Sequence, residues 1–458
     1  MSDHKQKALE YSKINKDGFL NQLISLCKLP SVSTDPEAKP AMQETAEWVA
    51  EKLTSIGIEN IQVMPTAGHP VVYGDHLHAG DDASTVLVYG HYDVQPADPL
   101  ELWDTPPFEP TLKGGNLYAR GASDMKGQTL AGIFAVESIL KQGALPVNIK
   151  FMIEGEEEIG SPSLEAFIEQ NADLLACDFA LNPDGSILGA DKPSIAYALR
   201  GLAYFEIRVQ GPAGDLHSGM FGGTVLNPAN ELARLIAGMQ DENGRITLPG
   251  FYDDVLEMSE QERDELARLP MDEEYYYNLT GAPMLYGEKG FSPVERTGAR
   301  PTLDVNGFLS GFTGEGSKTV LPAKAMAKVS MRLVPNQHPD KVEEQLHQYV
   351  EENARPGITW EILTHAGAVP SMSPIDSEGV RALAAGMEEV WGKKPFYYRV
   401  GGTIPVVGQL ETILGAPSVL TGFGLPDDNL HAPNEKLTLE PWYMGIDTLI
   451  HFFYNLKE

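Results

Sequence analysis

The sequence is poor in cysteine and has no long apolar run. Only two cysteines, Cys27 and Cys177, occur among 458 residues, which excludes a scaffold built on disulfides. No apolar run approaches the roughly 20 residues of a membrane span, and the polar first 18 residues contain no signal-peptide core. These absences predict a globular protein of a reducing, cytoplasmic compartment that does not cross a membrane.

Basic residues are also scarce. The chain has 34 lysines and arginines against 65 aspartates and glutamates, which gives a formal net charge of −31. A surface this acidic repels phosphate backbones, so nucleic-acid binding is not expected. The hydrophobic content of 42% is ordinary for a globular protein. At 458 residues the chain exceeds the size that one core usually reaches, so we expect two domains.

Segments typical of strands and helices alternate in both terminal parts of the chain. Helix-like spacing occurs over residues 5–28, 41–56, 124–142, 162–175, 374–391 and from 441 onward. Strand-like runs occur at residues 61–64, 71–73, 85–89, 147–153, 177–181, 396–400 and 417–421. This alternation predicts an α/β fold, with a mainly parallel sheet flanked by helices. Ligands bind such sheets at the carboxyl ends of the strands.

The middle of the chain has a different pattern. Residues 204–209 and 325–333 alternate like strands with one exposed face, and residues 229–239 and 341–352 are helix-like, whereas residues 245–300 look irregular. This pattern predicts an antiparallel sheet with helices on one face. We therefore expect an inserted α+β domain at residues 199–373, within a catalytic domain formed by residues 1–198 and 374–458.

Histidine or acidic side chains directly follow three of the predicted strands: His91 with Asp93, Glu157 with Glu158, and Asp184. Asp124 stands where a loop enters a long helical pattern, and His431 lies in a loop after a later strand. Because neighbouring parallel strands end at one edge of a sheet, these side chains are expected to meet there.

Imidazole nitrogen and carboxylate oxygen are the ligands that zinc and related cations take. The candidate ligands are His91, Asp124, Glu158, Asp184 and His431. If Asp124 bridges two cations, each cation has three protein ligands and room for water. Glu157, beside Glu158, is then the candidate general base.

Each of these residues also has an ordinary structural explanation. A histidine after a strand is commonly a hydrogen-bonding residue, a run of glutamates commonly starts a solvated helix, and Asp124 suits a helix N-cap. Asp184 in Asn-Pro-Asp-Gly suits a turn, and His431 suits a loop. Their joint placement at successive strand ends favours the metal site.

Four segments, GHYDVQP, GASDMKG, EGEEEIGS and GDLHSGMFGG, together resemble the co-catalytic zinc exopeptidases. That family includes carnosinases and other cytosolic dipeptidases, aminoacylase, glutamate carboxypeptidase and succinyl-diaminopimelate desuccinylase. The resemblance covers nearly the whole chain, and residues 301–337 are most similar to the cytosolic dipeptidase branch.

The resemblance implies two divalent metal ions per chain, zinc, with manganese and cobalt as alternatives. It implies that His91 and Asp184 bind one ion, that Glu158 and His431 bind the other, and that Asp124 bridges them. Asp93 is implied to orient His91, and Glu157 to act as general base. The peptide bond between Asp124 and Met125 is expected to be cis.

The resemblance also implies that the inserted domain acts as a lid and forms a homodimer. His217 of the DLHSG segment would then reach in trans into the active site of the second copy and stabilise the oxyanion. Arg332 is implied to clamp the substrate carboxylate, with Thr403 and Thr319 as further substrate-binding residues.

The predicted function is hydrolysis, by a dinuclear metal site, of the amide bond of dipeptides or short peptides with a free C-terminal carboxylate. One alternative is an N-acyl-amino-acid deacylase that uses the same residues, and another is a peptide-binding homologue without catalysis. The presence of Glu157 and all five ligands favours an enzyme. Assays of dipeptides beside N-acyl amino acids separate the two activities.

Overall fold

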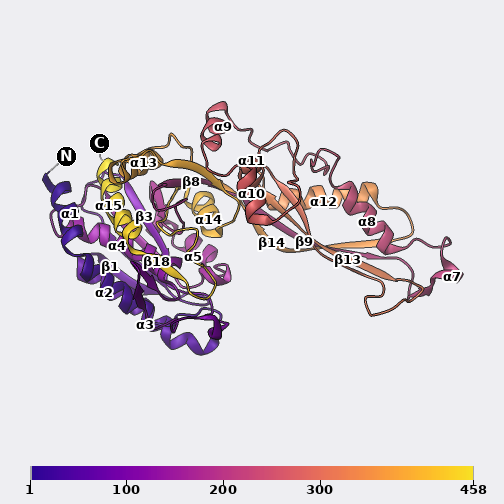
Figure 1. Ribbon diagram of the computed structural model, residues 1–458, viewed down its shortest axis with the longest axis horizontal. Helices are drawn as coiled ribbons and strands as arrows, with labels where there is room; N and C mark the ends of the chain where they lie inside the picture. The colour runs from indigo at the N-terminus through magenta and orange to yellow at the C-terminus, as the bar shows by residue number, and fades with distance from the viewer. Residues whose placement is uncertain (1–2, 457–458) are drawn as a thin grey trace. The chain divides into compact units, whose positions relative to one another are not determined.

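The computed structural model describes residues 3–456, which form two compact units with separate hydrophobic cores. The first unit contains the chain up to Tyr197, Ser373–Tyr397 and the chain from Pro405 onward, and the second contains Ala198–Met372 and Tyr398–Ile404. The order of their helices and strands can be followed by colour in Figure 1. Within residues 3–456, no helix has the length and apolar character needed to span a membrane.

The segment Tyr398–Ile404 lies outside the insertion expected at residues 199–373, yet it groups with the second unit. Hydrogen bonds explain this difference. Arg200 Nε donates to the backbone oxygen of Gly401 over 3.1 Å, and Thr403 Oγ1 donates to that of Arg200 over 2.6 Å. These contacts join residues about 200 positions apart, so no local sequence pattern predicts them.

Three parallel strands rich in β-branched and aromatic residues lie at the centre of the first unit. β3 (Thr85–His91) lies between β6 (Asn148–Glu154) and β7 (Phe179–Asn182) and is parallel to both. Nearly every residue of β3 and β6 is buried, as expected for central strands covered on both faces. The carboxyl ends of these strands therefore share one edge of the sheet.

Further strands extend this nine-stranded sheet: β1 (Glu59–Met64), β2 (Val71–His76), β8 (Ser194–Leu199), β15 (Ser371–Met372), β16 (Phe396–Val400) and β17 (Ser418–Leu420). β17 is parallel to β7, whereas β2 is antiparallel to β6 and β1 is antiparallel to β2. β8 pairs with β17, β15 and β16. The sheet is thus mixed, with its parallel strands at the centre.

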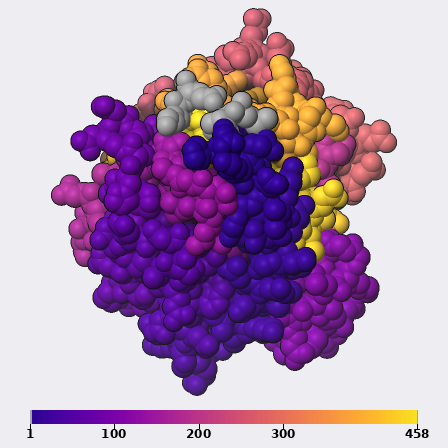
Figure 2. Space-filling view, turned by 90° about the vertical axis from the view of Figure 1, so that its left-hand side faces the viewer, coloured from indigo at the N-terminus to yellow at the C-terminus, as the bar shows by residue number. Residues whose placement is uncertain are grey.

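Helices cover the sheet of the first unit: α1 (Asp3–Ile14), α2 (Lys16–Cys27), α3 (Lys39–Ile56), α4 (Gly127–Leu140), α5 (Leu164–Gln170), α6 (Ala172–Leu175), α13 (Glu378–Trp391), α14 (Pro405–Leu414) and α15 (Leu439–Asn455). α4 is buried along almost its whole length and packs against α1, α2, α3 and α15. Figure 2 shows the indigo N-terminal helices covering one face, with yellow C-terminal residues beside them.

A small antiparallel sheet joins two loops of the first unit. β18 (Lys436–Thr438) pairs with β5 (Asn116–Tyr118), which pairs with β4 (Thr111–Lys113). The chain runs from β5 toward Asp124, and it enters β18 just after the loop that contains His431. This pairing therefore brings two predicted ligand loops close together.

The second unit is an antiparallel sheet in the order β11 (Thr302–Ser310), β13 (Lys324–Leu333), β9 (Gly201–Gln210) and β14 (Thr359–Ala368). Alternate residues of β13 are buried, and they form one core with α8 (Pro228–Gly238) and α12 (Pro339–Asn353). A second small pair consists of β10 (Leu216–His217) and β12 (Val320–Leu321), and α7 (Ser218–Phe221) follows β10.

Three predicted segments differ from the structure. Residues 5–28 form two helices, because the backbone leaves helical geometry at Asn15, with φ −97° and ψ 11°. Residues 162–175 are divided in the same way at Asn171. Residues 245–300, which look irregular in sequence, contain α9 (Glu260–Ala267), α10 (Glu273–Thr280) and α11 (Pro293–Gly298). Capping boxes that start at Ser259 and Ser292 begin two of these helices, and both are readable in the sequence.

Candidate metal centre

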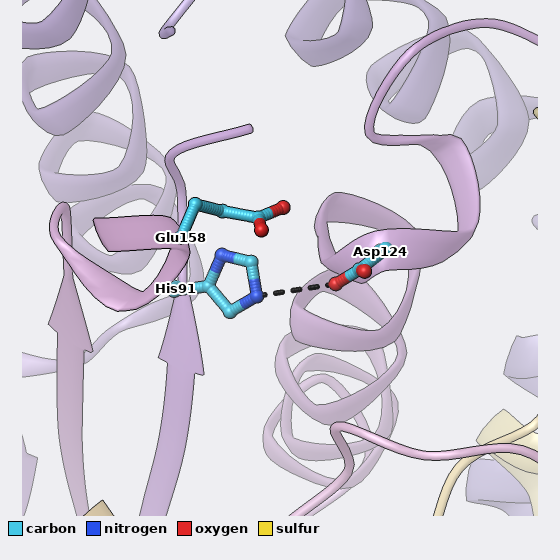
Figure 3. A group of neighbouring side chains, drawn as sticks. All are labelled: His91, Asp124 and Glu158. Atoms are coloured by element: carbon cyan, nitrogen blue, oxygen red, sulfur yellow. Dashed lines mark ion pairs between the residues drawn. The ribbon is translucent and has the colours of Figure 1, made fainter. Parts of the chain in front are cut away.

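Histidine and acidic side chains meet where three neighbouring strands of the first unit end. His91 is the last residue of β3, Glu157 and Glu158 lie in the short turn η4 (Glu157–Ile159) after β6, and Asp184 lies two residues beyond β7. Figure 3 shows His91 and Glu158 extending from these strand ends toward Asp124, which precedes α4. The structure thus brings the predicted residues together at the predicted edge.

Asp124 lies between two histidines. It belongs to the turn η3 (Ala122–Lys126), and its peptide bond to Met125 is cis. Its Oδ1 lies 3.3 Å from His91 Nε2, and its Oδ2 lies 2.9 Å from His431 Nε2. Burial alone would raise the pKa of Asp124, but the two histidines hold it well below its ordinary value. A carboxylate with one oxygen toward each histidine is placed to bridge two cations.

His91 is fully buried and presents one ring nitrogen to the cluster. Its Nδ1 lies 3.0 Å from the backbone oxygen of Asp93 and 3.3 Å from the carboxylate of the same residue. Its Nε2 is buried and finds no hydrogen-bond partner within residues 3–456. An unsatisfied buried nitrogen is costly, so this position calls for another ligand. A cation at Nε2, with Nδ1–H directed at Asp93, fits the arrangement.

His431 faces the second oxygen of Asp124, and Glu158 lies near both histidines, with a ligand atom within 4.8 Å of those of His91 and Asp124. His431 Nε2 lies 3.2 Å from Glu158 Oε2. Gln95 Nε2 donates to that same Oε2 over 2.9 Å and to the backbone oxygen of Glu158 over 3.1 Å, which fixes the glutamate side chain. The hydrogen bonds to Asp124 and Glu158 raise the pKa of His431 to about 10.

Asp184 and Glu157 complete the cluster on the side of His91. Asp184 Oδ2 lies 4.0 Å from His91 Nε2, and the ligand atoms of His91, Glu157 and Asp184 all lie within 4.8 Å of one another. Burial, with the help of nearby carboxylates, raises the pKa of Glu157 to about 7. The backbone N–H groups of Glu157 and Glu158 donate to the two carboxylate oxygens of Asp93 over 3.2 Å and 3.1 Å. Asp93 therefore fixes both His91 and the turn that carries the glutamates.

The cluster holds more negative charge than nearby side chains balance. Within residues 3–456, the ion pairs of Asp124, Glu158 and Asp184 are formed only with His91 and His431. Carboxylates with so little exposure are costly unless a cation neutralises them. Imidazole and carboxylate ligands suit zinc, and carboxylates also suit manganese. The donor set therefore fits divalent metal ions.

The other predicted residues lie in the second unit, in two separate places. His217 is exposed at the end of β10, and the backbone oxygen of Thr319 accepts a hydrogen bond from Ser218 N over 3.0 Å. Arg332 lies near the end of β13, and its Nη1 donates to Thr403 Oγ1 over 3.0 Å. In the structure His217 is thus opposite Val320, which directly follows Thr319, and Arg332 contacts Thr403.

Sequence reasoning assigns no role to four polar residues around the cluster: Gln95, Arg120, Asp428 and Glu435. Gln95 contacts Glu158, as described above, and the other three connect the loops that carry Asp124 and His431. The sequence signal for them is weak. Glu435 stands four residues after His431 in His-Ala-Pro-Asn-Glu, and Gln95 two residues after Asp93.

The class of protein that this architecture and donor set define is a metal-dependent hydrolase. The pattern of Peptidase family M20/M25/M40 matches residues 87–455. The chain belongs to this peptidase family.

Relatives match the chain over almost its full length. It is 33% identical to the Cys-Gly metallodipeptidase of Schizosaccharomyces pombe (strain 972 / ATCC 24843), over 99% of this chain and 98% of the relative. It is 31% identical to the Beta-Ala-His dipeptidase of Homo sapiens, over 99% and 93%. A solved M20 family metallo-carboxypeptidase from Sulfolobus solfataricus is 36% identical, with a TM-score of 0.81 over 96% of this chain and 99% of that one. These findings confirm the predicted fold class and the resemblance to the dipeptidase branch.

Proposed function

We propose that this chain hydrolyses the amide bond of dipeptides or short peptides with a free C-terminal carboxylate. The observation that carries the proposal is Asp124, whose two carboxylate oxygens face the nitrogens of His91 and His431 at 3.3 Å and 2.9 Å. The names of the relatives from Schizosaccharomyces pombe and Homo sapiens, a Cys-Gly metallodipeptidase and a Beta-Ala-His dipeptidase, support a peptide substrate.

The proposed metal centre holds two cations. His91 and Asp184 would hold the first, which we call the His91-side ion, and Glu158 and His431 would hold the second, the His431-side ion. Asp124 would be a ligand of both. Zinc suits these ligands, and manganese and cobalt are the alternatives. Three protein ligands per ion leave coordination positions for water and substrate.

The two cations would polarise the scissile carbonyl and lower the pKa of the attacking water. Glu157 accepts the proton of that water and returns it to the leaving amine nitrogen. Its position supports this role, because its ligand atom lies within 4.8 Å of those of His91 and Asp184 and its backbone is fixed to Asp93. Asp93 holds the His91 ring in the orientation that aims Nε2 at the cluster.

Arg332 is the proposed clamp for the substrate carboxylate. A guanidinium can donate two parallel hydrogen bonds to a carboxylate, which fixes orientation as well as charge. The hydrogen bond from Arg332 Nη1 to Thr403 Oγ1 holds the side chain in place, and Thr403 in turn donates to the backbone of Arg200. Thr403 and Thr319 are proposed as further substrate-binding residues.

His217 is proposed to act in trans, in a homodimer formed through the second unit. β12, which pairs with β10, ends just before β13 begins at Lys324, whereas Arg332 lies near the far end of β13. Most of this ten-residue strand, roughly 25 Å, therefore separates His217 from Arg332. Figure 1 shows α7, which follows His217, toward one end of the four-stranded sheet of the second unit and α11 toward the other end.

A dipeptide spans only about 7 Å when extended, so one molecule cannot contact both His217 and Arg332 of the same chain. A second copy that supplies His217 removes this difficulty. The surface beside His217 also suits association, because Met220 and Phe221 of α7, which follows His217, are 71% and 39% exposed.

A reducing, cytoplasmic location is also proposed. Cys27 and Cys177 are both free thiols. Burial raises the pKa of Cys27 to about 12 and that of Cys177 to about 11, so both are kept in the unreactive protonated form.

The direct test is a substrate panel assayed with added zinc, manganese or cobalt. Cys-Gly, β-Ala-His and other dipeptides are compared with tripeptides and with N-acetyl and N-succinyl amino acids. We expect dipeptides to have the highest kcat/KM and a chelator to abolish hydrolysis. Faster cleavage of N-acyl amino acids would instead establish a deacylase, and unchanged hydrolysis after chelation would contradict the proposal.

The role of Glu157 is tested by Glu157→Gln, which keeps the shape of the side chain but removes the base. General acid–base catalysis contributes about 10²- to 10⁴-fold, so kcat should fall by that factor while both metal ions stay bound. Glu156→Gln is the matched control. Glu156 accepts hydrogen bonds from the backbone N–H groups of His69 and Ser163, so its loss should lower stability with little change in kcat.

Action in trans is tested by mixing inactive His217→Ala chains with inactive Glu157→Gln chains. Random exchange makes half of the dimers mixed, and each mixed dimer contains one intact site, so about one quarter of the wild-type rate should return. Absence of recovery, after labelled subunits are shown to have exchanged, would place His217 in its own chain's site or outside catalysis.

A further inference from the structure

Two loops of the first unit carry Asp124 and His431. We define the Asp124 loop as residues 119–124 and the His431 loop as residues 425–435. β5 runs directly into the first loop and β18 directly follows the second, and these strands pair with Tyr118 opposite Lys436. The pairing continues into the loops, because Ala119 N donates to the backbone oxygen of Glu435 over 3.2 Å. The loops are thus joined at one end by a strand pair.

The Glu435 carboxylate joins the loops a second time. It is fully buried and accepts four hydrogen bonds, all from the Asp124 loop. Oε2 accepts from Arg120 Nη1 and Gly121 N, each over 2.8 Å. Oε1 accepts from Ser123 N over 2.9 Å and from Asp124 N over 3.0 Å. One side chain of the His431 loop therefore determines the path of the backbone up to the proposed bridging residue.

Arg120 makes the connection in the opposite direction. Besides its bond to Glu435, its Nη2 donates over 3.2 Å to the backbone oxygen of Ala432, which directly follows His431. The same nitrogen donates to Pro96 O over 3.2 Å, and the guanidinium lies 5.4 Å from the centre of the Trp103 ring. Arg120 is only 1% exposed, so this contact is shielded from water.

Asp428 forms a third tie between the loops. Its Oδ2 accepts from Ser123 Oγ over 2.9 Å and from Leu425 N over 2.7 Å. Its Oδ1 accepts from Lys436 Nζ over 2.9 Å. Asp428 is fully buried, and the bond from Ser123 comes from the residue just before Asp124.

The His431 loop needs such ties, because regular secondary structure does not support it. His431 itself has φ +59°, and Asn429 and Asn434 have φ +56° and +63°. Residues other than glycine pay roughly 1–3 kcal/mol for this left-handed conformation and keep it only when their surroundings enforce it. The His431 side chain is 55% exposed, so packing around the ring does not hold it.

We propose that Glu435 is a positioning residue that holds Asp124 and His431 at the spacing needed for the His431-side ion. This inference rests on the proposed ligand assignment. That ion takes ligands from both loops, whereas the His91-side ion takes only Asp124 from them. Loss of the Glu435 carboxylate should therefore weaken the His431-side ion more than the other. Asp428 supports the same spacing through Ser123.

The test uses Glu435→Gln in the full chain, with cobalt as the metal. The amide places an NH₂ group against N–H donors, so at least two of the four bonds are lost without a change in volume. Metal-free protein is titrated calorimetrically, and the cobalt absorption spectrum is recorded at one equivalent. Outer-shell changes typically cost 10- to 100-fold in metal affinity, and we expect a loss of about that size at one site. The one-equivalent spectrum should match that of His431→Ala, which identifies the weakened site.

Glu288→Gln is the matched control. Glu288 is also a buried carboxylate paired with a buried arginine, since it accepts from Arg300 Nε and Nη2 over 2.8 Å each, but it lies in the second unit. Its substitution should lower the melting temperature and leave both cobalt affinities within about threefold of wild type. Ser123→Ala is a milder second variant, which removes only the bond to Asp428. It should weaken the same site as Glu435→Gln, by less than tenfold.

The outcomes separate this inference from the proposed function. Suppose that wild-type protein binds two cobalt ions and that Glu435→Gln and Ser123→Ala each keep both cobalt affinities within about threefold of wild type. Glu435 is then merely structural, and the inference is overturned. Equal weakening of both sites would overturn it as well. If wild-type protein fails to bind two ions, the proposed metal centre itself is wrong, and the inference falls with it.

Discussion

The two histidines on either side of Asp124 are held in opposite ways. His91 ends a buried strand, is completely buried, and has its ring fixed by Asp93. His431 belongs to a loop with left-handed backbone positions, and its side chain is 55% exposed. Regular secondary structure places the first histidine. Hydrogen bonds that Arg120 donates to the Glu435 carboxylate and to the backbone oxygen of Ala432 place the loop of the second.

The difference shows how the two halves of the proposed centre depend on the rest of the fold. On the His91 side, the ends of two adjacent strands, β3 and β7, determine where His91 and Asp184 lie, so little order has to be gained on binding. On the His431 side, the loop keeps its shape only while its polar contacts persist. We therefore expect the His91-side ion to bind more tightly and to be the last to leave on chelation.

The largest effect is expected from Asp124→Asn, which removes the ligand that both halves share. Both ions should bind more weakly, and kcat/KM should fall by at least about 10³-fold, since metal ions supply several kcal/mol of transition-state stabilisation. Asp184→Asn is the control, and it should weaken only the His91-side ion. Metal content after dialysis, measured by mass spectrometry, checks both variants. If Asp124→Asn retains two ions, Asp124 does not bridge them.

The comparison itself is tested by His91→Ala against His431→Ala. In each variant the affinity for the ion on the side of the removed histidine should fall more than 100-fold. Loss of a ligand should exceed the 10- to 100-fold effect of outer-shell changes. Their effects on stability should differ. Removal of buried His91 should cost the metal-free protein about 1–3 kcal/mol, and removal of exposed His431 about 0.5 kcal/mol or less. Chemical denaturation measures both, and equal losses would show that the two halves are held alike.

A smaller effect is expected from Asp93→Asn. The amide retains one of the two oxygens that accept from Glu157 N and Glu158 N, but it orients His91 less well. The His91-side ion should lose about 10- to 100-fold in affinity, while the His431-side ion changes little. Calorimetric titration of Asp93→Asn and Glu435→Gln should then show the His91-side ion weakened in the first variant and the His431-side ion in the second. If both variants weaken the same ion, the two ions are not held independently, which contradicts the comparison.

The smallest effect is expected from Gln95→Leu. It removes the donor to Glu158 Oε2 and keeps a side chain of similar size. A typical hydrogen bond contributes about 0.5–1.5 kcal/mol net, so the His431-side ion should lose about 10-fold in affinity or less. The affinity of the His91-side ion is measured in the same titration as an internal control, and it should stay at the wild-type value.

Much of the fold could be predicted from the sequence because its signals are local. The β-branched run Thr85–Tyr89 predicts β3, and Gly57, with φ +103°, ends α3 where the sequence indicates. The three helices within residues 245–300 were missed, although capping boxes at Ser259 and Ser292 mark two of their starts. The assignment of Tyr398–Ile404 to the second unit depends on contacts with Arg200, which no local pattern reveals.

The candidate site divides in the same way. His91, Glu158 and Asp184 could be predicted to meet, because each follows a strand and adjacent parallel strands end at one edge. The roles of His217 and Arg332 came only from the resemblance to a family, and they stay predictions. Glu435 could not be found, because its bonds reach residues more than 310 positions away. The sequence around a glutamate in a polar loop does not indicate whether its side chain is exposed to water or is buried and hydrogen-bonded to a loop that carries a metal ligand.

The central claim is that Asp124 bridges two cations, one beside His91 and one beside His431. Anomalous diffraction at the zinc absorption edge, from crystals grown with zinc, tests it most directly. The account predicts two peaks on either side of the Asp124 carboxylate, one contacting His91 and Asp184 and the other Glu158 and His431. A single peak, or two peaks without Asp124 between them, would contradict it.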